Sequence, residues 1–171
     1  MDLVSHPCIQ IIVICVGREK WRFVNFYNDV ADGTAMRTLK GLDLDATVPT
    51  LLVRDFNMHS RTWSPGNWDL TPRVNMFEGW AASQTFEFLT VPWTITRQGI
   101  ETDRPSPLDL TWRNLSAAIG PTFYGVEVDW PGSLGSDHVL IRTQATTALN
   151  SRPPKEERRK GYNLYPTKRE A

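Results

Sequence analysis

Cysteine is scarce in this chain of 171 residues, and the chain carries no net charge. The two cysteines, Cys8 and Cys15, lie close together near one end, and nothing else in the sequence supports a disulfide framework. We therefore expect a reduced, intracellular chain, with the nucleus among the compartments open to it. Because nineteen basic residues balance nineteen acidic ones, the whole-chain charge favours no nucleic acid, membrane or acidic partner.

Long apolar runs are also missing. The stretch from Ile9 to Val16 is too short to cross a bilayer, and Asp2 and His6 precede it instead of a basic region. Its length and flanking residues indicate a strand and argue against a signal peptide or a membrane segment. His6 and Cys8 have no second pair at metal-ligand spacing, so a zinc site is not expected.

What the chain does have is the composition of a globular protein, with 40% hydrophobic and 11% aromatic residues. We expect one domain over residues 1–149 and a basic linker or solvated tail over residues 150–171. The tail holds seven basic residues against three acidic ones, which leaves a net charge of −4 for the rest. Contact between this tail and a phosphate backbone is the alternative.

The residue pattern predicts alternating strands and short helices. The first strand is expected to be buried on both faces. The helix that begins at Thr71 and Pro72 is expected to extend as far as Phe88, because apolar residues keep helical spacing up to that point. The region between Pro92 and Pro107 has no period and is expected to be an extended loop. The predicted strands are 11–16, 21–27, 50–53, 108–112 and 139–141, and the predicted helices begin at Thr34 and Thr71.

Polar groups recur at or near the ends of three of these strands. Asp55 and Asn57 follow the apolar run 51–53, Asp109 lies on the strand 108–112, and Asp137 and His138 open the last strand. An isolated Asp-x-Asn is more often an Asx-type turn than a site. Together, an acid and amide pair, an orienting acid and an acid and histidine pair are what phosphodiester cleavage with a divalent cation needs.

These segments resemble motifs of the endonuclease/exonuclease/phosphatase superfamily, which has the deoxyribonuclease I-like fold. The matching segments are Asp55-Phe56-Asn57, Ser106-Pro107-Leu108-Asp109 and Ser136-Asp137-His138, in the family's order. Their flanks, among them His59 to Pro65 and Asp109 to Trp112, are similar to the endonuclease domain of non-LTR retrotransposon polyproteins. The resemblance covers residues 11–143.

The resemblance implies an α/β fold, a two-sheet α/β sandwich with helices outside and the active site on one rim. It implies a DNA substrate, a Mg²⁺ or Mn²⁺ cofactor and a place in a longer polyprotein that includes a reverse transcriptase. No membrane partner and no small-molecule cofactor beyond the metal is expected.

The same resemblance assigns a role to each motif residue. Asp55 orients or deprotonates the attacking water, Asn57 holds that water, and Asp109 orients His138. His138 contacts the scissile phosphate, and Asp137 and Asp55 hold the metal. Tyr27 matches a phosphate-contacting tyrosine, and His59 matches a structural position of the retrotransposon branch.

Two departures from the family pattern leave alternatives open. Family members begin with a strand bearing an asparagine and a strand bearing a metal-ligating glutamate, and neither precedes Ile11 here. Arg54 also stands where the family has glycine, so its cation either crowds the rim or pairs with Asp55.

The sequence leaves three hypotheses for the function. The first is a DNA-nicking endonuclease, and the second is a truncated, catalytically inactive remnant of one. A phosphatase of the same fold is the third.

Overall fold

A computed structural model describes residues 6–16, 19–29, 33–64, 66, 71–99, 104–114 and 122–146. The expected tail after residue 149 lies outside these ranges, so its structure stays a prediction. The elements are β1 (Ile9–Val16), β2 (Glu19–Phe26), α1 (Thr34–Lys40), β3 (Thr50–Asp55), α2 (Pro72–Ser83), β4 (Phe86–Phe88), β5 (Asp109–Asn114), β6 (Thr122–Asp129), a 3-10 turn η1 (Pro131–Ser133) and β7 (Leu140–Thr146).

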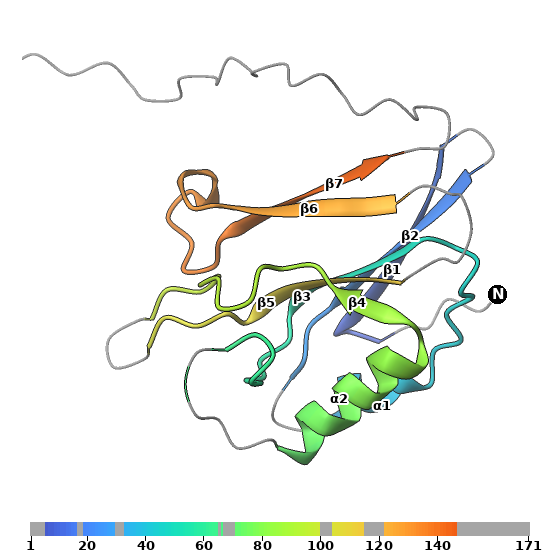
Figure 1. Cartoon of the computed structure of the whole chain (residues 1–171), viewed down its shortest axis with the longest axis horizontal. Helices are drawn as coiled ribbons and strands as arrows, with labels where there is room; N and C mark the ends of the chain where they lie inside the picture. The colour runs from blue at the N-terminus through green and yellow to red at the C-terminus, as the bar shows by residue number, and fades with distance from the viewer. Residues whose placement is uncertain are drawn as a thin grey trace, which may run out of the picture.

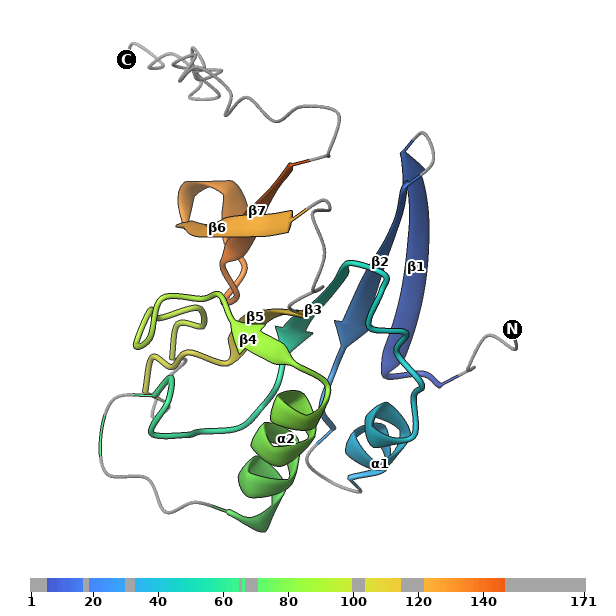
Figure 2. The same cartoon turned by 45° about the vertical axis from the view of Figure 1, so that its right-hand side comes forward.

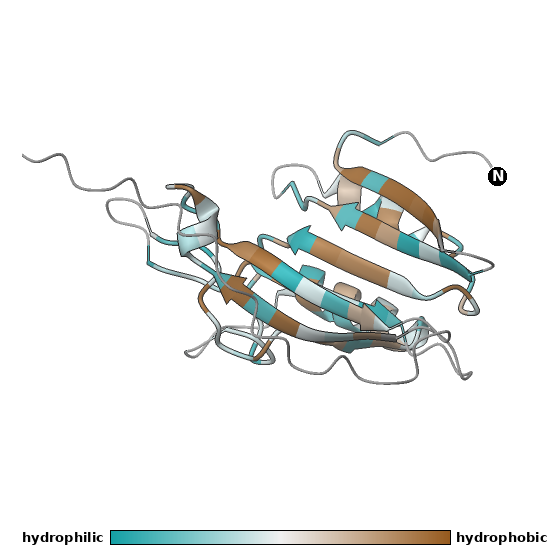
Figure 3. Ribbon diagram, turned by 90° about the horizontal axis from the view of Figure 1, so that it is seen from above, coloured by the Kyte–Doolittle hydropathy of each residue, from teal (hydrophilic) through white to brown (hydrophobic). Residues whose placement is uncertain are grey.

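Five strands form the main sheet in the order β1-β2-β3-β5-β4. The predicted hairpin of β1 and β2 is confirmed, with Ile14 paired to Trp21. The prediction that this first strand is buried on both faces was wrong. Ile12, Val13 and Ile14 are 45%, 50% and 46% exposed. Figure 3 shows this apolar strand at the margin of the sheet. An edge strand has a neighbour on one side only, so its apolar residues are covered less than those of a central strand.

A second sheet of two antiparallel strands, β6 and β7, lies over one face of the main sheet, and the two helices lie against the other face (Figures 1 and 2). The sequence reading missed β6, although Phe123, Val126 and Val128 are strand-forming residues within it. Phe123 joins the sheets by packing edge-on against Trp21 and Phe23. Two packed sheets with outer helices confirm the expected α/β sandwich.

The larger core lies between the main sheet and the helices. Helix α2 begins as predicted, because the Thr71 hydroxyl accepts a hydrogen bond from the Val74 N–H and Pro72 follows it. Its predicted extension to Phe88 was wrong. The helix ends at Ser83, Thr85 has a positive φ of 55°, and Phe88 lies on β4. The largest fully buried side chains of this core include Trp63, Phe26, Phe56, Phe77 and Met36.

The sheet brings two of the motif acids to the same end. β3 runs parallel to β2 and antiparallel to β5, so the last residue of β3, Asp55, pairs in register with the first residue of β5, Asp109. Cys8 and Cys15 are both free thiols. No helix in the part of the chain that the structure describes is long and apolar enough to cross a membrane.

Candidate active site

Asp55 and Asn57 lie where the buried strand β3 leaves the sheet. The Asp55 carboxylate accepts a hydrogen bond of 3.0 Å from the Asn57 N–H, which closes a short turn. Asn57 has a positive φ of 45°, a conformation that asparagine tolerates better than most residues. The segment is therefore an Asx-type turn, and it also delivers an acid and an amide to the end of the sheet.

Asn28 holds this turn against the end of β2. It is fully buried, and its N–H donates to the Asp55 carbonyl (2.9 Å) while its side-chain amide donates to the Phe56 carbonyl (2.8 Å). In return, the Asn57 side-chain amide donates to the Asn28 carbonyl at 3.2 Å. The structure therefore makes Asn28 the residue that positions Asp55 and Asn57.

Asp109 and His138 form a direct pair. The imidazole Nδ1 lies 2.8 Å from a carboxylate oxygen of Asp109, which is itself buried. The His138 N–H donates to the Ser136 hydroxyl at 3.1 Å, which helps to fix the loop that carries the histidine. Because Asp109 accepts from Nδ1, the other ring nitrogen of His138 is the one that can meet a ligand.

A bridging segment, Thr96 to Gln98, joins β5, which carries Asp109, to the loop that carries His138. The Asp109 N–H donates to the Thr96 hydroxyl at 2.8 Å, and the Val139 N–H donates to the Thr96 carbonyl at 2.8 Å. Arg97 makes isolated β-bridges to both Ser106 and His138. This segment falls in the region predicted to be an extended loop, and it ties β5 to the start of β7.

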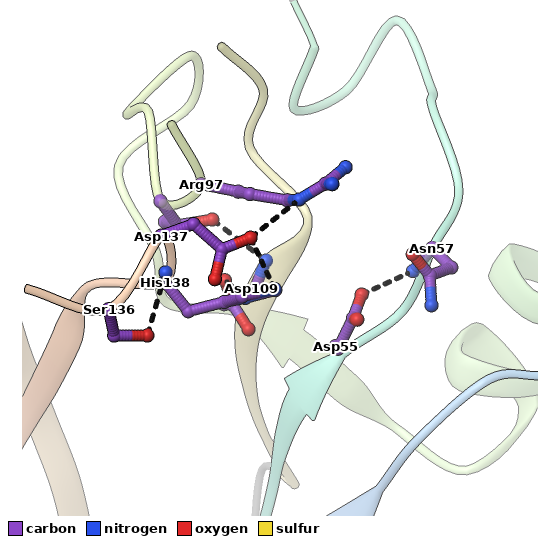
Figure 4. Close-up of polar contacts among 8 residues, drawn as sticks. Asp55, Asn57, Arg97, Asp109, Ser136, Asp137 and His138 are labelled. Atoms are coloured by element: carbon purple, nitrogen blue, oxygen red, sulfur yellow. Dashed lines mark hydrogen bonds and ion pairs between the residues drawn. The ribbon is translucent and has the colours of Figure 1, made fainter. Parts of the chain in front are cut away.

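The Asp137 carboxylate also lies beside the His138 imidazole. One of its carboxylate oxygens lies 3.4 Å from Arg97 Nε and 4.0 Å from His138 Nε2. Figure 4 shows Arg97 reaching across the group above Asp137, with its guanidinium end towards Asn57 and Asp55. Asp55, Asn57, Asp109, Asp137 and His138 are hereafter called the strand-end rim.

The electrostatics of the rim are those of crowded acids. Burial raises the pKa of Asp55, and the neighbouring charge of Asp109 raises it further. Burial likewise raises the pKa of Asp109, against the lowering effect of its hydrogen bond with His138. Each carboxylate therefore holds a proton more readily than an exposed aspartate does, and the rim favours a positive charge nearby.

Arg54 and Tyr27 lie beside the rim. The Arg54 guanidinium sits 5.9 Å from the centre of the Tyr27 ring, which is 40% exposed, and its charge partly offsets the rise that burial causes in the pKa of Asp109. The contact of Arg54 with Tyr27 differs from the pairing with Asp55 that the sequence left open, and it places the Arg54 cation beside the rim. Tyr27 precedes Asn28, so it stands one residue from the backbone contact that holds Asn57.

His59 belongs to the packing behind the rim. Its Nδ1 lies 3.2 Å from the Ser64 hydroxyl, and burial lowers the pKa of the imidazole. The neighbouring Trp63 is fully buried and donates from its indole to the Met58 carbonyl at 3.0 Å. This arrangement supports the structural role that the resemblance implies for His59.

The motif residues were predictable from the sequence, whereas two of their partners were not. Thr96 acts through a contact with Asp109, 13 residues away in sequence, and Arg97 through a contact with Asp137, 40 residues away. The β-branched run Thr94-Ile95-Thr96 is the one local sign of extended backbone there.

The chain was compared with known proteins. The model of a family described as endonuclease-reverse transcriptase matches residues 21–142. Among solved structures, the chain is similar to the endonuclease domain of TRAS1, a telomere-specific non-LTR retrotransposon, with 18% identity and a TM-score of 0.63 over 83% of this chain and 65% of that one. It is also similar to an endonuclease/exonuclease/phosphatase family protein from Leptotrichia buccalis, with 16% identity and a TM-score of 0.52 over 81% of this chain and 53% of that one.

At these identities the likeness shows the fold, and it confirms the deoxyribonuclease I-like class. The chain spans less than two thirds of the length of these two solved structures. The comparison with curated proteins gave no match.

Proposed function

Because the chain belongs to the endonuclease-reverse transcriptase family, we propose that its strand-end rim hydrolyses phosphodiester bonds and that its substrate is DNA, which it nicks. The observation that carries this proposal is the 2.8 Å pair of Asp109 and His138 on the same sheet end as Asp55 and Asn57. That arrangement combines an oriented histidine with a buried acid, which is the pairing that phosphoryl transfer to water requires.

His138 acts on the scissile phosphate. In the protonated imidazolium, the Nδ1–H donates a hydrogen bond to Asp109, which fixes the ring, and the Nε2–H donates to a phosphate oxygen. A fixed donor stabilises the charge that builds on the phosphoryl oxygens in the transition state. In this role Asp109 is a positioning residue.

Asp55 and Asn57 act on the attacking water. The raised pKa of Asp55 makes it a stronger base than an exposed aspartate, so it accepts the proton that water loses as its oxygen bonds to phosphorus. The phosphorus–oxygen bond to the leaving strand breaks in the same step, and the departing oxygen takes a proton from solvent. One Asp55 oxygen accepts from the Asn57 N–H, and the Asn57 side chain offers a carbonyl oxygen to orient the water.

We also propose dependence on Mg²⁺ or Mn²⁺. Carboxylate oxygens are the ligands these ions prefer, and Asp55 and Asp137 would supply them. Among the described residues, no three His, Cys, Asp or Glu side chains are grouped so as to hold a metal ion, so water and phosphate oxygens would complete the shell. When bound, the ion neutralises charge on the phosphate.

Two further assignments belong to this proposal. Tyr27, exposed beside Asn28, contacts a phosphate of the bound DNA. The domain works within a longer protein that also carries a reverse transcriptase, as the description of the family suggests.

A nicking assay on supercoiled plasmid tests the function. Wild-type protein with Mg²⁺ should convert supercoiled to open-circular DNA, and His138→Ala should lower the rate by at least about a hundredfold, since a positioned acid or base contributes at least that much. His59→Gln is the matched control, because it changes a histidine outside the rim and should nick at nearly the wild-type rate. Chelation of the metal with EDTA should stop nicking.

Two results would contradict the proposal. Equal rates for wild type and His138→Ala would mean that the rim is not the catalytic site. No nicking by either protein would favour the inactive remnant.

A further inference from the structure

We propose that Arg97 binds a phosphate group of the DNA, exchanging its ion pair with Asp137 for a phosphate oxygen. The inference rests on the proposed function of the strand-end rim and adds to it a substrate-binding residue that no motif marks.

The position of Arg97 is built by the fold. Its N–H donates to the Ser106 carbonyl and its carbonyl accepts from the Ser106 N–H, both at 2.9 Å, so both backbone polar groups of Arg97 are paired with Ser106. The next residue, Gln98, donates its N–H to the Asp137 carbonyl at 2.7 Å. Arg97 is therefore anchored to the segments that carry Asp109 and Asp137, and its side chain is directed across the rim (Figure 4).

Arg97 also supplies the charge that the rim needs for an anionic ligand. Three carboxylates, from Asp55, Asp109 and Asp137, would repel a phosphate. The Arg97 guanidinium pairs with Asp137, and Figure 4 shows it reaching towards Asp55, so its charge lies near both sides of the rim. A guanidinium is also the side-chain cation whose fork of N–H groups best matches phosphate oxygens.

The present contact with Asp137 is one that a phosphate can replace. At 3.4 Å it is longer than the 2.7–2.9 Å typical of strong charge-assisted hydrogen bonds. The side chains of Arg97 and Asp137 are 27% and 35% exposed, so solvent and ligand reach both. When Arg97 turns to the phosphate, the Asp137 carboxylate is released for its proposed role in metal binding.

Metal-free DNA binding tests the proposal apart from catalysis. We would measure anisotropy of a short fluorescent DNA duplex in EDTA at several salt concentrations. Arg97→Gln should weaken binding by at least about tenfold, as expected for a lost charged hydrogen bond. It should also reduce the slope of log K against log salt by about one unit. The matched control is Arg142→Gln, which removes another arginine paired to an aspartate, Asp129, and it should bind like wild type.

A second pair of variants keeps the test decisive if Arg97→Gln folds poorly. Asp137→Asn removes the carboxylate that pairs with Arg97 and should strengthen metal-free binding more than Asp129→Asn, which removes the same charge from the Asp129–Arg142 pair. Adding Arg97→Gln to Asp137→Asn should abolish that gain.

The proposal is overturned if Arg97→Gln and Arg142→Gln bind alike, if Asp137→Asn gains no more than Asp129→Asn, or if wild type does not bind the duplex in EDTA. Its failure is separable from that of the proposed function. If His138→Ala abolishes nicking but Arg97→Gln does not change DNA binding, only the inference about Arg97 is contradicted. Arg97-dependent binding without any nicking would sink the catalytic proposal and leave this one standing.

Discussion

Arg54 holds a backbone conformation that suits glycine. Its φ is 105°, in the left-handed half of the map where a Cβ clashes with the backbone. The residue directly precedes Asp55, so the strain lies at the rim itself. Strain of this kind persists where the surrounding structure imposes it, and here the buried strand β3 does so.

Replacing Arg54 should separate its backbone strain from its charge. Arg54→Gly and Arg54→Ala both remove the guanidinium from Tyr27, but only glycine relieves the strain. We expect Arg54→Gly to be more stable than Arg54→Ala by about 1 kcal/mol. Urea unfolding of both variants measures the difference, and equal stabilities would show that the positive φ costs nothing.

Asp55 should make the protein less stable as the pH rises. Its folded pKa lies above the ordinary value of 3.8, so the native state keeps the proton to higher pH than the unfolded chain does. The free energy of unfolding therefore falls as the pH rises from 3.8 through the raised pKa. Asp55→Asn should be more stable than wild type at pH 7, and the gain should vanish in acid, where Asp55 is protonated. Thermal melts across this pH range check the prediction.

Asp45 is the control of opposite sign. The Thr47 side chain and backbone bond its carboxylate and lower its pKa. The stability it contributes is present above pH 3.8 and is lost as the pH falls through the lowered value. Asp45→Asn should therefore weaken the protein at pH 7 and not in acid. A gain at neutral pH from both substitutions would contradict the assignment.

At this scale the motif acids were predictable and their partners were not. Asp55, Asp109 and His138 lie in short sequence motifs beside apolar runs. Arg97 lies in a stretch without period, and its contact with Asp137 spans 40 residues. A contact over this sequence separation cannot be predicted from local sequence patterns, because it depends on the whole fold.

Among the elements, the bridging segment Thr96 to Gln98 matters most to the site. Thr96 is fully buried and satisfies the Asp109 N–H with its hydroxyl and the Val139 N–H with its carbonyl. Thr96 thereby links Asp109 at the start of β5 to the residue that follows His138.

Thr96→Val should loosen the Asp109–His138 pair while keeping the side chain's shape. It leaves the buried Asp109 N–H without its hydroxyl partner, at a cost of about 1–3 kcal/mol in unfolding free energy, and it should lower the nicking rate in the folded protein. Thr94→Val, two residues before Thr96, is the control and should change stability by less than about 0.5 kcal/mol. If the two variants unfold and nick alike, the bridge has no positioning role.

The helix end at Ser83 shows why element boundaries were harder to predict than elements. The spacing from Phe77 continues to Phe88, yet the chain turns at Thr85 with φ 55° and re-enters the sheet as β4. Trp80 stacks on Phe86 across that turn. Tertiary packing on both sides therefore decides the boundary, and helical periodicity alone does not register it.

For the molecule as a whole, the sandwich was predictable because its signals are long and redundant. Apolar runs, turn residues and the order of the motifs all agree. The exposure of β1 was not predictable, because an Ile-rich and Val-rich run looks the same in the centre and at the edge of a sheet.

The β1 edge should make the domain prone to self-association. Val13, half exposed on that strand, offers apolar surface beside backbone groups that can pair with another chain. Val13→Lys should reduce light scattering on heating without lowering the melting temperature by more than a few degrees. Ile11→Lys is the contrast, because Ile11 packs against the main core and its replacement should destabilise the fold. Unchanged scattering in Val13→Lys would place the association elsewhere.

The central claim is that the strand-end rim acts as one catalytic unit. The most direct measurement is the plasmid-nicking rate of wild type, Asp109→Asn, His138→Ala and the double variant under identical conditions. If Asp109 works through its 2.8 Å contact with His138, each single variant loses most of the rate and the double variant is no slower than His138→Ala. Losses that multiply in the double variant, or nicking that neither substitution reduces, would contradict the account.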